Sequence, residues 1–333
     1  MEGSEPTEEA VRERAPGAGP ALDAPLWTRI DGASLPERLV GGKARGIQRL
    51  LAADLPVPPA ACLTTAAFAL HLGQPVPAAA LRVLGGSDDA DEAIAALVEA
   101  ILAAPLPEAL AAALEEAVAW LGSAWPGSPL AVRSSAVGED AGGASFAGQY
   151  LTRLGVAPRD VPRAVRECYA SLWSPAAVGY RRRAGADLAT AEMAVVLMPL
   201  VPAEASAVAF SRDPVLGRRD VLLVEAARGL GEVIVSGEVT PDSIVLDRAS
   251  LQVRSVTTGG QQWRLRADPS GTPVREPVVD GGSALGDRQL AELGRLVLQA
   301  EERLGGPVDV EAAWADDRWW LLQARPITAG VGA

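Results

Sequence analysis

Four polar side chains near the carboxyl end of the sequence have the spacing of a single chemical site. Two segments with strand character, 307–314 and 319–327, flank a three-residue polar tip centred on Asp317. A hairpin with that tip and alternating side chains brings four polar groups to one face. It pairs them as Asp309 with Arg325 and Glu311 with Gln323. The opposite face, which we expect on the core side, carries Val310, Ala312, Leu322 and Ala324.

Such a polar face suits the binding of a metal ion and a phosphate. Carboxylate and amide oxygens are ligands for Mg²⁺, which takes phosphate oxygens and waters as its further ligands. An arginine beside them suits a phosphoryl group that develops charge during transfer. The alternative is a solvated strand face with an Asp–Arg pair worth roughly 0.2–1 kcal/mol. Spacing alone leaves both interpretations open.

A second candidate is Lys43, the only lysine among 30 basic residues. Its retention in an arginine-rich sequence indicates a position that needs a compact point charge, unless it is chance. Lys43 follows two glycines, Gly41 and Gly42, at the start of a predicted helix. Small residues and a helix N-terminus let backbone N–H groups approach an anion, so this lysine is placed to reach a phosphate.

A third candidate is the segment 131–149, which is rich in glycine and serine. Arg133 lies at the end of a short strand, where it could neutralise a triphosphate covered by the following loop. An ordinary mobile surface loop is the alternative, but Phe146 is an aromatic anchor that a flexible linker would not need. The turn 229–232 either closes a nucleotide pocket or simply connects two elements.

The order of elements predicts an α+β fold with two lobes and a site between them. Residues 1–24 predict a disordered acidic tail, 25–193 a mixed first lobe with the phosphate loop, and 194–329 a strand-rich second lobe. The expected helices are 42–51, 89–104, 107–122, 161–180 and 287–304. The expected strands before the hairpin are 130–132, 194–201, 205–210, 221–226 and 243–247.

Composition excludes several classes of protein. The 333 residues are 49% apolar and 22% charged, as in a globular protein with a sizeable core. No apolar run approaches the roughly 20 residues of a membrane span, and the acidic N-terminus is not a signal peptide. The net charge of −12 argues against nucleic-acid and anionic-membrane partners. Cys62 and Cys168 are predicted to be buried free thiols, which fits a cytoplasmic protein.

Together these segments resemble the ATP-grasp nucleotide-binding domain of the phosphoenolpyruvate synthase, pyruvate phosphate dikinase and rifampin phosphotransferase family. The resemblance runs from about Gly41 to Thr328. Its motifs, in order, are GGKARGIQRL, LPVPPAACLTT, AVRSSAVGEDAGGASFAGQ, VRECYASLWSPAAVGYR, VPAEASAVAFSRDP, ARGLGEVIVSGEVTPD and VDVEAAW…LLQARPIT. Each motif is modest evidence, but seven in the correct order are highly specific. The resemblance implies a two-lobed ATP-grasp fold of the pyruvate phosphate dikinase N-terminal type.

The resemblance also implies a phosphate-binding role for residues of the first lobe. Lys43 and Arg133 would contact the ATP phosphates and, with Arg325 of the hairpin, would be the catalytic residues. The loop that includes Ser145, Gly148 and Gln149 would cover the phosphates.

Residues of the second lobe would hold the metal ion by the same resemblance. Glu311 and Gln323 would bind Mg²⁺, Asp309 would support the metal site, and Arg325 would steady the transferred phosphoryl group. These implied roles coincide with the polar face that the hairpin spacing predicts, and they favour the metal site over the solvated face.

The adenine would lie against Met198, Leu200 and Val201, where the sequence departs from its family. The usual pattern there is Gln-x-Met-Val, and Met198 cannot donate a hydrogen bond as the glutamine amide would. Pro199 offers no N–H group. These departures concern the adenine site, and none of the predicted phosphate or metal ligands is lost.

The resemblance implies a dikinase-type reaction with Mg·ATP. A phosphoryl group, the β-phosphoryl in this family, would pass to a histidine on a separate carrier protein or domain, with AMP and phosphate as products. His71, the only histidine, has an apolar context that predicts a structural role. Direct phosphorylation of a small molecule and a non-catalytic ATP-binding regulatory module are the alternatives. The sequence leaves the final acceptor and the oligomeric state open.

Overall fold

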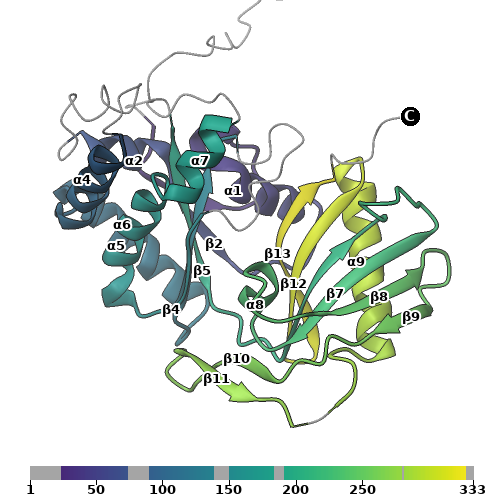
Figure 1. Cartoon of the computed structure of the whole chain (residues 1–333). Helices are drawn as coiled ribbons and strands as arrows, with labels where there is room; N and C mark the ends of the chain where they lie inside the picture. Colours follow the sequence, from purple (N-terminus) through teal and green to yellow (C-terminus); the bar gives the residue numbers. More distant parts are fainter. Residues whose placement is uncertain (1–23, 74–89, 139–149, 184–190, 280, 328–333) are drawn as a thin grey trace, which may run out of the picture.

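The computed structural model describes residues 24–73, 90–138, 150–183, 191–279 and 281–327 (Figure 1). These residues form two lobes, each built on one antiparallel sheet with helices packed against it. The predicted α+β class is therefore confirmed. Of the predicted tail 1–24, residues 1–23 lie outside the described residues.

The first lobe is a five-stranded sheet in the order β1-β2-β5-β3-β4. Its strands are β1 (Trp27–Ile30), β2 (Ala60–Leu63), β3 (Leu130–Ala136), β4 (Thr152–Val156) and β5 (Met193–Pro199). The three inner strands, β2, β5 and β3, are buried along their whole length. Both faces of this sheet are therefore covered, which explains why β2 and β5 are continuous apolar runs. Strand β3 is equally buried but also carries Arg133, Ser134 and Ser135.

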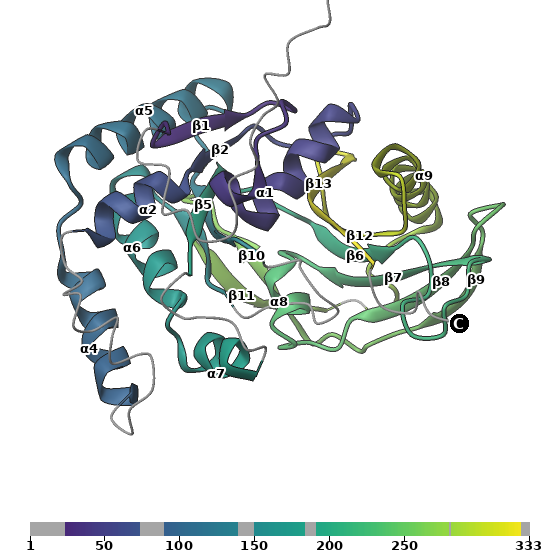
Figure 2. The ribbon, with the colours of Figure 1, turned by 90° about the horizontal axis from the view of Figure 1, so that it is seen from above.

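Different helices cover the two faces of the first sheet. In β5, Val195 and Leu197 pack with one group of helices, whereas Val196 and Met198 face α1 (Glu37–Ala52). That group consists of α2 (Thr65–Leu72), α4 (Ala90–Ala103), α5 (Glu108–Ala124), α6 (Val161–Ser171) and α7 (Pro175–Arg183), with the short 3₁₀ helix η1 (Pro158–Asp160) leading into α6. Figure 2 shows α1 on the side that faces the second lobe. Helix α1 therefore lies between the first sheet and the rest of the molecule.

The second lobe is a six-stranded sheet in the order β13-β12-β6-β7-β8-β9. Its strands are β6 (Ala205–Phe210), β7 (Val221–Arg228), β8 (Asp242–Asp247), β9 (Val253–Thr257), β12 (Val308–Ala315) and β13 (Arg318–Pro326). Helix α9 (Asp287–Leu304) packs its apolar stripe on one face of this sheet (Figure 2). Alternate residues of β6 and β7 point toward α9 and form a hydrophobic core with it. The opposite face of the sheet is not covered by α9.

A two-stranded hairpin connects the lobes below the main sheets (Figure 1). It consists of β10 (Trp263–Ala267) and β11 (Pro273–Pro277). In the middle of β10, the Leu265 carbonyl accepts from the Leu230 N–H of the second lobe at 2.8 Å. At the tip of the hairpin, Gly271 approaches the first lobe so closely that a Cβ on it would lie 1.9 Å from Pro129 Cγ. The hairpin therefore spans from the second lobe to the first.

Helix α1 joins the lobes through two glycines that allow close contact with backbone on both sides. A Cβ on Gly41 would lie 2.0 Å from the carbonyl oxygen of Ser135 in β3. A Cβ on Gly46 would lie 2.4 Å from the carbonyl oxygen of Ala324 in β13. Only a hydrogen fits at these two positions, so α1 contacts one strand of each sheet directly.

The main predicted helices and strands are present, and two differences concern the path of the chain through the lobes. The predicted helix 161–180 is two helices, because the chain turns at Ser174 and α7 restarts at Pro175, which has no N–H to continue α6. The predicted lobe boundary at residue 194 falls inside β5, which pairs with β2 and β3 of the first sheet. The chain therefore passes from one sheet to the other after Pro199.

Among the described residues, no single helix is long and apolar enough to cross a membrane. The pair formed by residues 91–103 and 108–124 passes the same test only when taken together, and the two helices are bent by 66° relative to each other.

We expect Gly46→Ala to lower the free energy of unfolding by about 1–3 kcal/mol, the usual cost of overpacking. The added methyl group would collide with the Ala324 carbonyl of β13. Gly122→Ala in α5 is the matched control, since a Cβ there has no atom within 4 Å. The control should be stabilised by up to about 1 kcal/mol, because alanine is the better helix former. Denaturant unfolding measures both variants, and an unchanged stability of Gly46→Ala would contradict the close contact.

The two cysteines should not react with a disulfide reagent at about pH 8 until the protein unfolds, because the thiolate is the reactive form. Cys62 and Cys168 are free and fully buried, as predicted. Burial raises the pKa of the Cys168 thiol to about 12 and also raises the pKa of the Cys62 thiol. Thiol titration with and without guanidinium chloride is the measurement. Rapid labelling of either cysteine in the native protein would show that this core opens.

Candidate functional site

A cavity of about 310 Å³ lies between the two lobes. Its walls come from β3, β4 and β5 of the first lobe, from α1, and from β6, α8 (Glu232–Val235), β12 and β13 of the second lobe. The predicted site residues that line it are Lys43, Arg133, Met198, Leu200, Val201, Glu311, Gln323 and Arg325. Residues as far apart in the sequence as Lys43 and Arg325 are thus brought to one cavity, as the two-lobed prediction requires.

Lys43 reaches the cavity from a kink in α1. Gly41 has φ 73° and ψ 176°, so the helix breaks there and a new turn begins just before the lysine. This turn is fastened to β3: the Ala44 N–H donates to Ser135 Oγ at 3.2 Å, and that hydroxyl donates to the Val40 carbonyl at 2.7 Å. The predicted helix start at Gly42 is therefore a kink inside a longer helix, and the kink fixes the position of Lys43.

Arg133 of β3 crosses from the first lobe to the second. Its guanidinium donates to Glu311 Oε2 at 2.6 Å, to Gln323 Oε1 at 3.0 Å and to the Leu322 carbonyl at 3.0 Å. The arginine is only 8% exposed and Gln323 only 1%. The sequence predicted Arg133 as a phosphate ligand and did not predict its contact with Glu311 and Gln323, the predicted metal ligands.

The polar face of the C-terminal hairpin has the predicted pairing. Asp309 lies opposite Arg325, and Glu311 lies opposite Gln323. Arg325 contacts Asp309 through two atom pairs, Nε to Oδ1 and Nη2 to Oδ2, each at 3.3 Å. Arg325 lines the cavity but Asp309 does not, so Asp309 contacts the site only through Arg325.

The tip of this hairpin differs from the prediction. Ala315 pairs with Arg318, so the turn has two residues, Asp316 and Asp317, with φ of 51° and 59°. Two-residue turns with positive φ match the twist of paired strands, and aspartate tolerates that conformation. A register shift after Glu311 then leaves Leu322 as an extra residue in β13. Leu322, which was expected to face the core, instead lines the cavity, and its carbonyl accepts from Arg133.

The charges at this end of the cavity favour an ionised Glu311. Burial opposes its ionisation, but the positive charges of Arg133, Arg325 and Lys43 prevail and hold the pKa of Glu311 below its usual value. Burial raises the pKa of Asp309, and the charge of Arg325 offsets this only in part. Lys43, Arg133 and Arg325 thus lie around two carboxylates, Glu311 and Asp309, so cationic side chains outnumber carboxylates at this end of the cavity.

The other end of the cavity is largely apolar. Met198, Leu200 and Val201 line it as predicted, at the crossover from β5 to the second lobe. The Leu200 N–H donates to the Pro129 carbonyl at 2.8 Å, and the Leu200 carbonyl accepts from Ser128 Oγ at 3.1 Å. Both backbone groups of Leu200 are therefore engaged within the protein, and the crossover presents mainly apolar side chains to a ligand.

Some lining residues were not predicted. They include Thr152 and Leu154 of β4 and the two residues just before it, Tyr150 and Leu151. The sequence prediction assigned no element to this stretch, which follows the predicted loop 131–149. Leu230 and Glu232 also line the cavity, which agrees with the suggestion that turn 229–232 closes a pocket. Burial raises the pKa of Glu232, and the charge of Glu238 raises it further. Ser145, Gly148 and Gln149 of the predicted covering loop lie outside the described residues.

The oxygen atoms of the site fit a magnesium ion that a phosphate ligand helps to hold. Glu311 and Gln323 present a carboxylate and an amide oxygen, which are hard donors suited to Mg²⁺. The described residues contain no group of three or more His, Cys, Asp or Glu side chains arranged to hold a metal ion without other ligands. Phosphate oxygens and waters would therefore have to complete the coordination, as Mg²⁺ commonly requires.

His71 is structural, as its sequence context predicted. It is fully buried, its ring packs 5.7 Å from that of Tyr169, and its Nε2 lies 3.3 Å from the Ile101 carbonyl. Burial lowers its pKa, so the ring is neutral at physiological pH.

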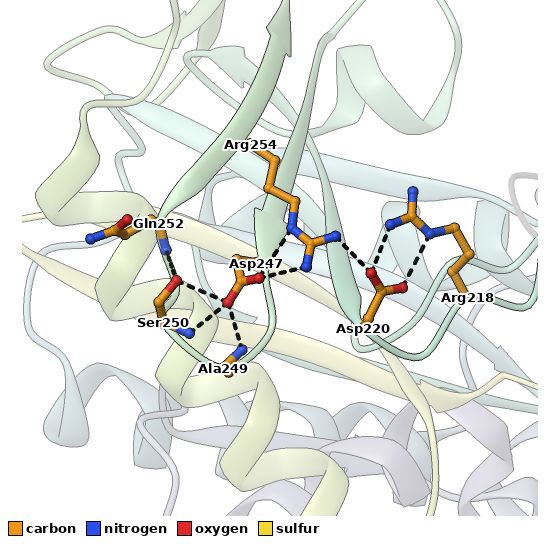
Figure 3. A network of polar contacts seen from close by, with 7 residues as sticks. All are labelled: Arg218, Asp220, Asp247, Ala249, Ser250, Gln252 and Arg254. Carbon is orange, nitrogen blue, oxygen red and sulfur yellow. Dashed lines mark hydrogen bonds and ion pairs between the residues drawn. The ribbon is translucent and has the colours of Figure 1, made fainter.

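A second polar cluster lies on the surface of the second lobe, outside the cavity. Asp220 pairs with Arg218 at 2.8 Å and with Arg254 at 2.6 Å, and Arg254 also pairs with Asp247 at 2.5 Å (Figure 3). The backbone of Ser250 donates to Asp247 at 2.8 Å. This network joins the ends of β7, β8 and β9 at the surface, where ion pairs contribute little, and none of these residues lines the cavity.

Comparison with known proteins identifies the same domain. Residues 37–331 match the family described as the pyruvate phosphate dikinase AMP/ATP-binding domain. The chain is 40% identical over 297 residues to a prodigiosin synthesizing transferase of Serratia marcescens, covering 88% of this chain and 32% of that protein. It is 37% identical over 316 residues to a rifampicin phosphotransferase of a Streptomyces species, covering 90% and 35%. A probable phosphoenolpyruvate synthase of Methanocaldococcus jannaschii is 34% identical over 305 residues, covering 87% and 25%.

These relatives agree with the resemblance seen in the sequence motifs. The chain spans about a third or less of the length of the three relatives, so the match concerns one domain of each. The family match covers nearly all the described residues of both lobes, including α1 and the C-terminal hairpin. This chain belongs to the pyruvate phosphate dikinase AMP/ATP-binding domain family.

Proposed function

We propose that this chain binds Mg·ATP in the cavity between its lobes and acts as an ATP-dependent phosphotransferase of dikinase type. The observation that carries the proposal is the convergence of five side chains on one cavity. They are Lys43 from α1, Arg133 from β3, Glu311 from β12, and Gln323 and Arg325 from β13. Cations beside a carboxylate and an amide oxygen form a site for a polyphosphate with its magnesium ion.

The polyphosphate would lie at the charged end of the cavity. Lys43 and Arg133 would neutralise the phosphate oxygens, and Arg325 would steady the phosphoryl group in transfer, since catalysis of this kind is mainly positioning and charge stabilisation. Magnesium held by Glu311 and Gln323 would supply charge neutralisation at the same oxygens.

The rest of the site would bind the base and support the charged residues. Asp309 would hold Arg325 in place through their ion pair. The adenine would lie against Met198, Leu200 and Val201, and the loop containing Ser145, Gly148 and Gln149 would cover the phosphates.

The acceptor we propose is a histidine outside this sequence. His71 is the only histidine of the 333 residues, and its burial in the first-lobe core excludes it. An acceptor imidazole nitrogen would form a bond to the β-phosphorus while the bond from that phosphorus to the α-phosphate oxygen breaks. AMP would then leave, water would release the γ-phosphate as inorganic phosphate, and the imidazole would lose its remaining N–H proton to solvent.

Nucleotide product analysis tests this proposal. The protein is incubated with radiolabelled Mg·ATP and an extract of its source cells, with Lys43→Ala as the control. AMP above the control supports the dikinase reaction and should be accompanied by an acid-labile phosphorylated protein. ADP above the control would instead indicate direct phosphorylation of a small molecule. No product despite measured ATP binding would indicate a regulatory module.

Lys43→Ala should weaken Mg·ATP binding at least tenfold, which corresponds to about 1.4 kcal/mol. The loss follows from removing a positive charge at the phosphate end of the cavity. Arg218→Ala is the matched control, because it removes one positive charge from the surface network outside the cavity. Isothermal titration calorimetry measures both affinities. Equal affinities for Lys43→Ala and the wild type would exclude this lysine from the phosphate site.

Glu311→Ala should abolish the enhancement of ATP binding by Mg²⁺ without weakening metal-free ATP binding. The carboxylate repels phosphate oxygens in the absence of a metal ion, and it attracts them through the metal ion when one is present. Titrations with Mg²⁺ and with a chelator separate the two quantities. Wild-type metal dependence and turnover in this variant would refute the assignment of Glu311 as a metal ligand.

A further inference from the structure

We infer that Arg133 occupies the position of the metal ion in the nucleotide-free protein, so that metal binding and the displacement of Arg133 toward the phosphates are one coupled event. The inference rests on the proposed function, because it takes the cavity to be an Mg·ATP site. It adds a second role for Arg133, that of a positioning residue which keeps the metal ligands closed until a nucleotide arrives.

The geometry places one nitrogen between the two metal ligands. The same Nη2 atom of Arg133 lies 2.6 Å from Glu311 Oε2 and 3.0 Å from Gln323 Oε1. A magnesium ion bound to both oxygens would have to lie about 2.0–2.1 Å from each, in the space that this nitrogen now fills. The ion and the guanidinium are both positive, so they cannot share this place.

The surroundings explain why Arg133 stays there when no ligand is present. Its Nη1 donates to the Leu322 carbonyl at 3.0 Å, which the bulge in β13 turns toward the first lobe. Arg133 is 8% exposed and Gln323 is 1% exposed, so neither can exchange its partner for bulk water easily. A metal ion that entered alone would leave a buried guanidinium without its acceptors, which is unfavourable.

A nucleotide removes this obstacle because its phosphates are new acceptors for Arg133. The arginine lines the cavity, so it can turn from Glu311 toward a bound polyphosphate and release both metal ligands. Coupling of this kind is reciprocal: whatever displaces Arg133 favours the metal ion, and the metal ion favours the displaced arginine. The chain therefore disfavours the metal ion in the absence of nucleotide.

The test is metal binding without nucleotide, read by electron paramagnetic resonance of Mn²⁺ as a substitute for Mg²⁺. We expect Arg133→Ala to bind Mn²⁺ at least tenfold more tightly than the wild type. Adding Glu311→Gln to that variant should abolish the gain, since it removes the charged ligand. Lys43→Ala is the control for charge alone, because Lys43 also acts on Glu311 through its charge, and it should change Mn²⁺ affinity less than about threefold.

Two results would overturn the inference: no gain in Arg133→Ala, or an equal gain in Lys43→Ala. Arg133→Lys serves if the alanine variant does not fold, because it keeps the charge but cannot span all three acceptors. It should give a smaller gain, and no gain in a folded lysine variant would also overturn the inference. Mg·ATP affinity of the wild type, measured separately, distinguishes the two failures. Absent ATP binding contradicts the proposed function, whereas intact ATP binding with unchanged Mn²⁺ affinity contradicts only the role of Arg133.

Discussion

The close packing of α1 between the two sheets is the constraint on which the rest of the structure depends. Gly41 meets the Ser135 carbonyl of β3, and Gly46 meets the Ala324 carbonyl of β13, at distances that admit no side chain. Lys43 lies between these two contacts on the same helix. The packing that joins the lobes therefore also brings the lysine to the cavity, and it holds β13 beside β3 so that the residues of these strands can meet across the site.

Where β3 meets the C-terminal hairpin, Arg133, Glu311 and Gln323 form a polar cluster. Its contribution to the stability of the fold does not explain why it is there. Arg133 and Glu311 are an ion pair with side-chain exposures of only 10% and 17%. Burying such a pair costs desolvation energy that the attraction between the charges often only balances. The bulge at Leu322 supplies one more acceptor, and the cluster becomes an organised polar surface facing the cavity. Arrangements of this kind are typical of sites prepared for a charged ligand.

Much of the fold could be predicted because strong local periodicity marks its elements. The bounds of α9 and β6 agree with the sequence prediction at both ends. The errors arose where the local sequence pattern does not distinguish between two possible structures. The apolar run of β5 looks the same whichever sheet it joins, so its membership of the first sheet could not be read from the sequence. To predict the break between α6 and α7, Pro175 would have had to be given more weight than the apolar pattern that continues across it.

The sequence by itself determined the family and the pairing of Asp309 with Arg325 and Glu311 with Gln323. Those features depend on motif order and on alternation along a hairpin, and both are local properties of the chain. Only the tertiary structure decided that Arg133 contacts Glu311 and Gln323, residues 178 and 190 positions away. That contact depends on how the two lobes pack against α1, and no spacing within a single segment encodes the distance between two sheets.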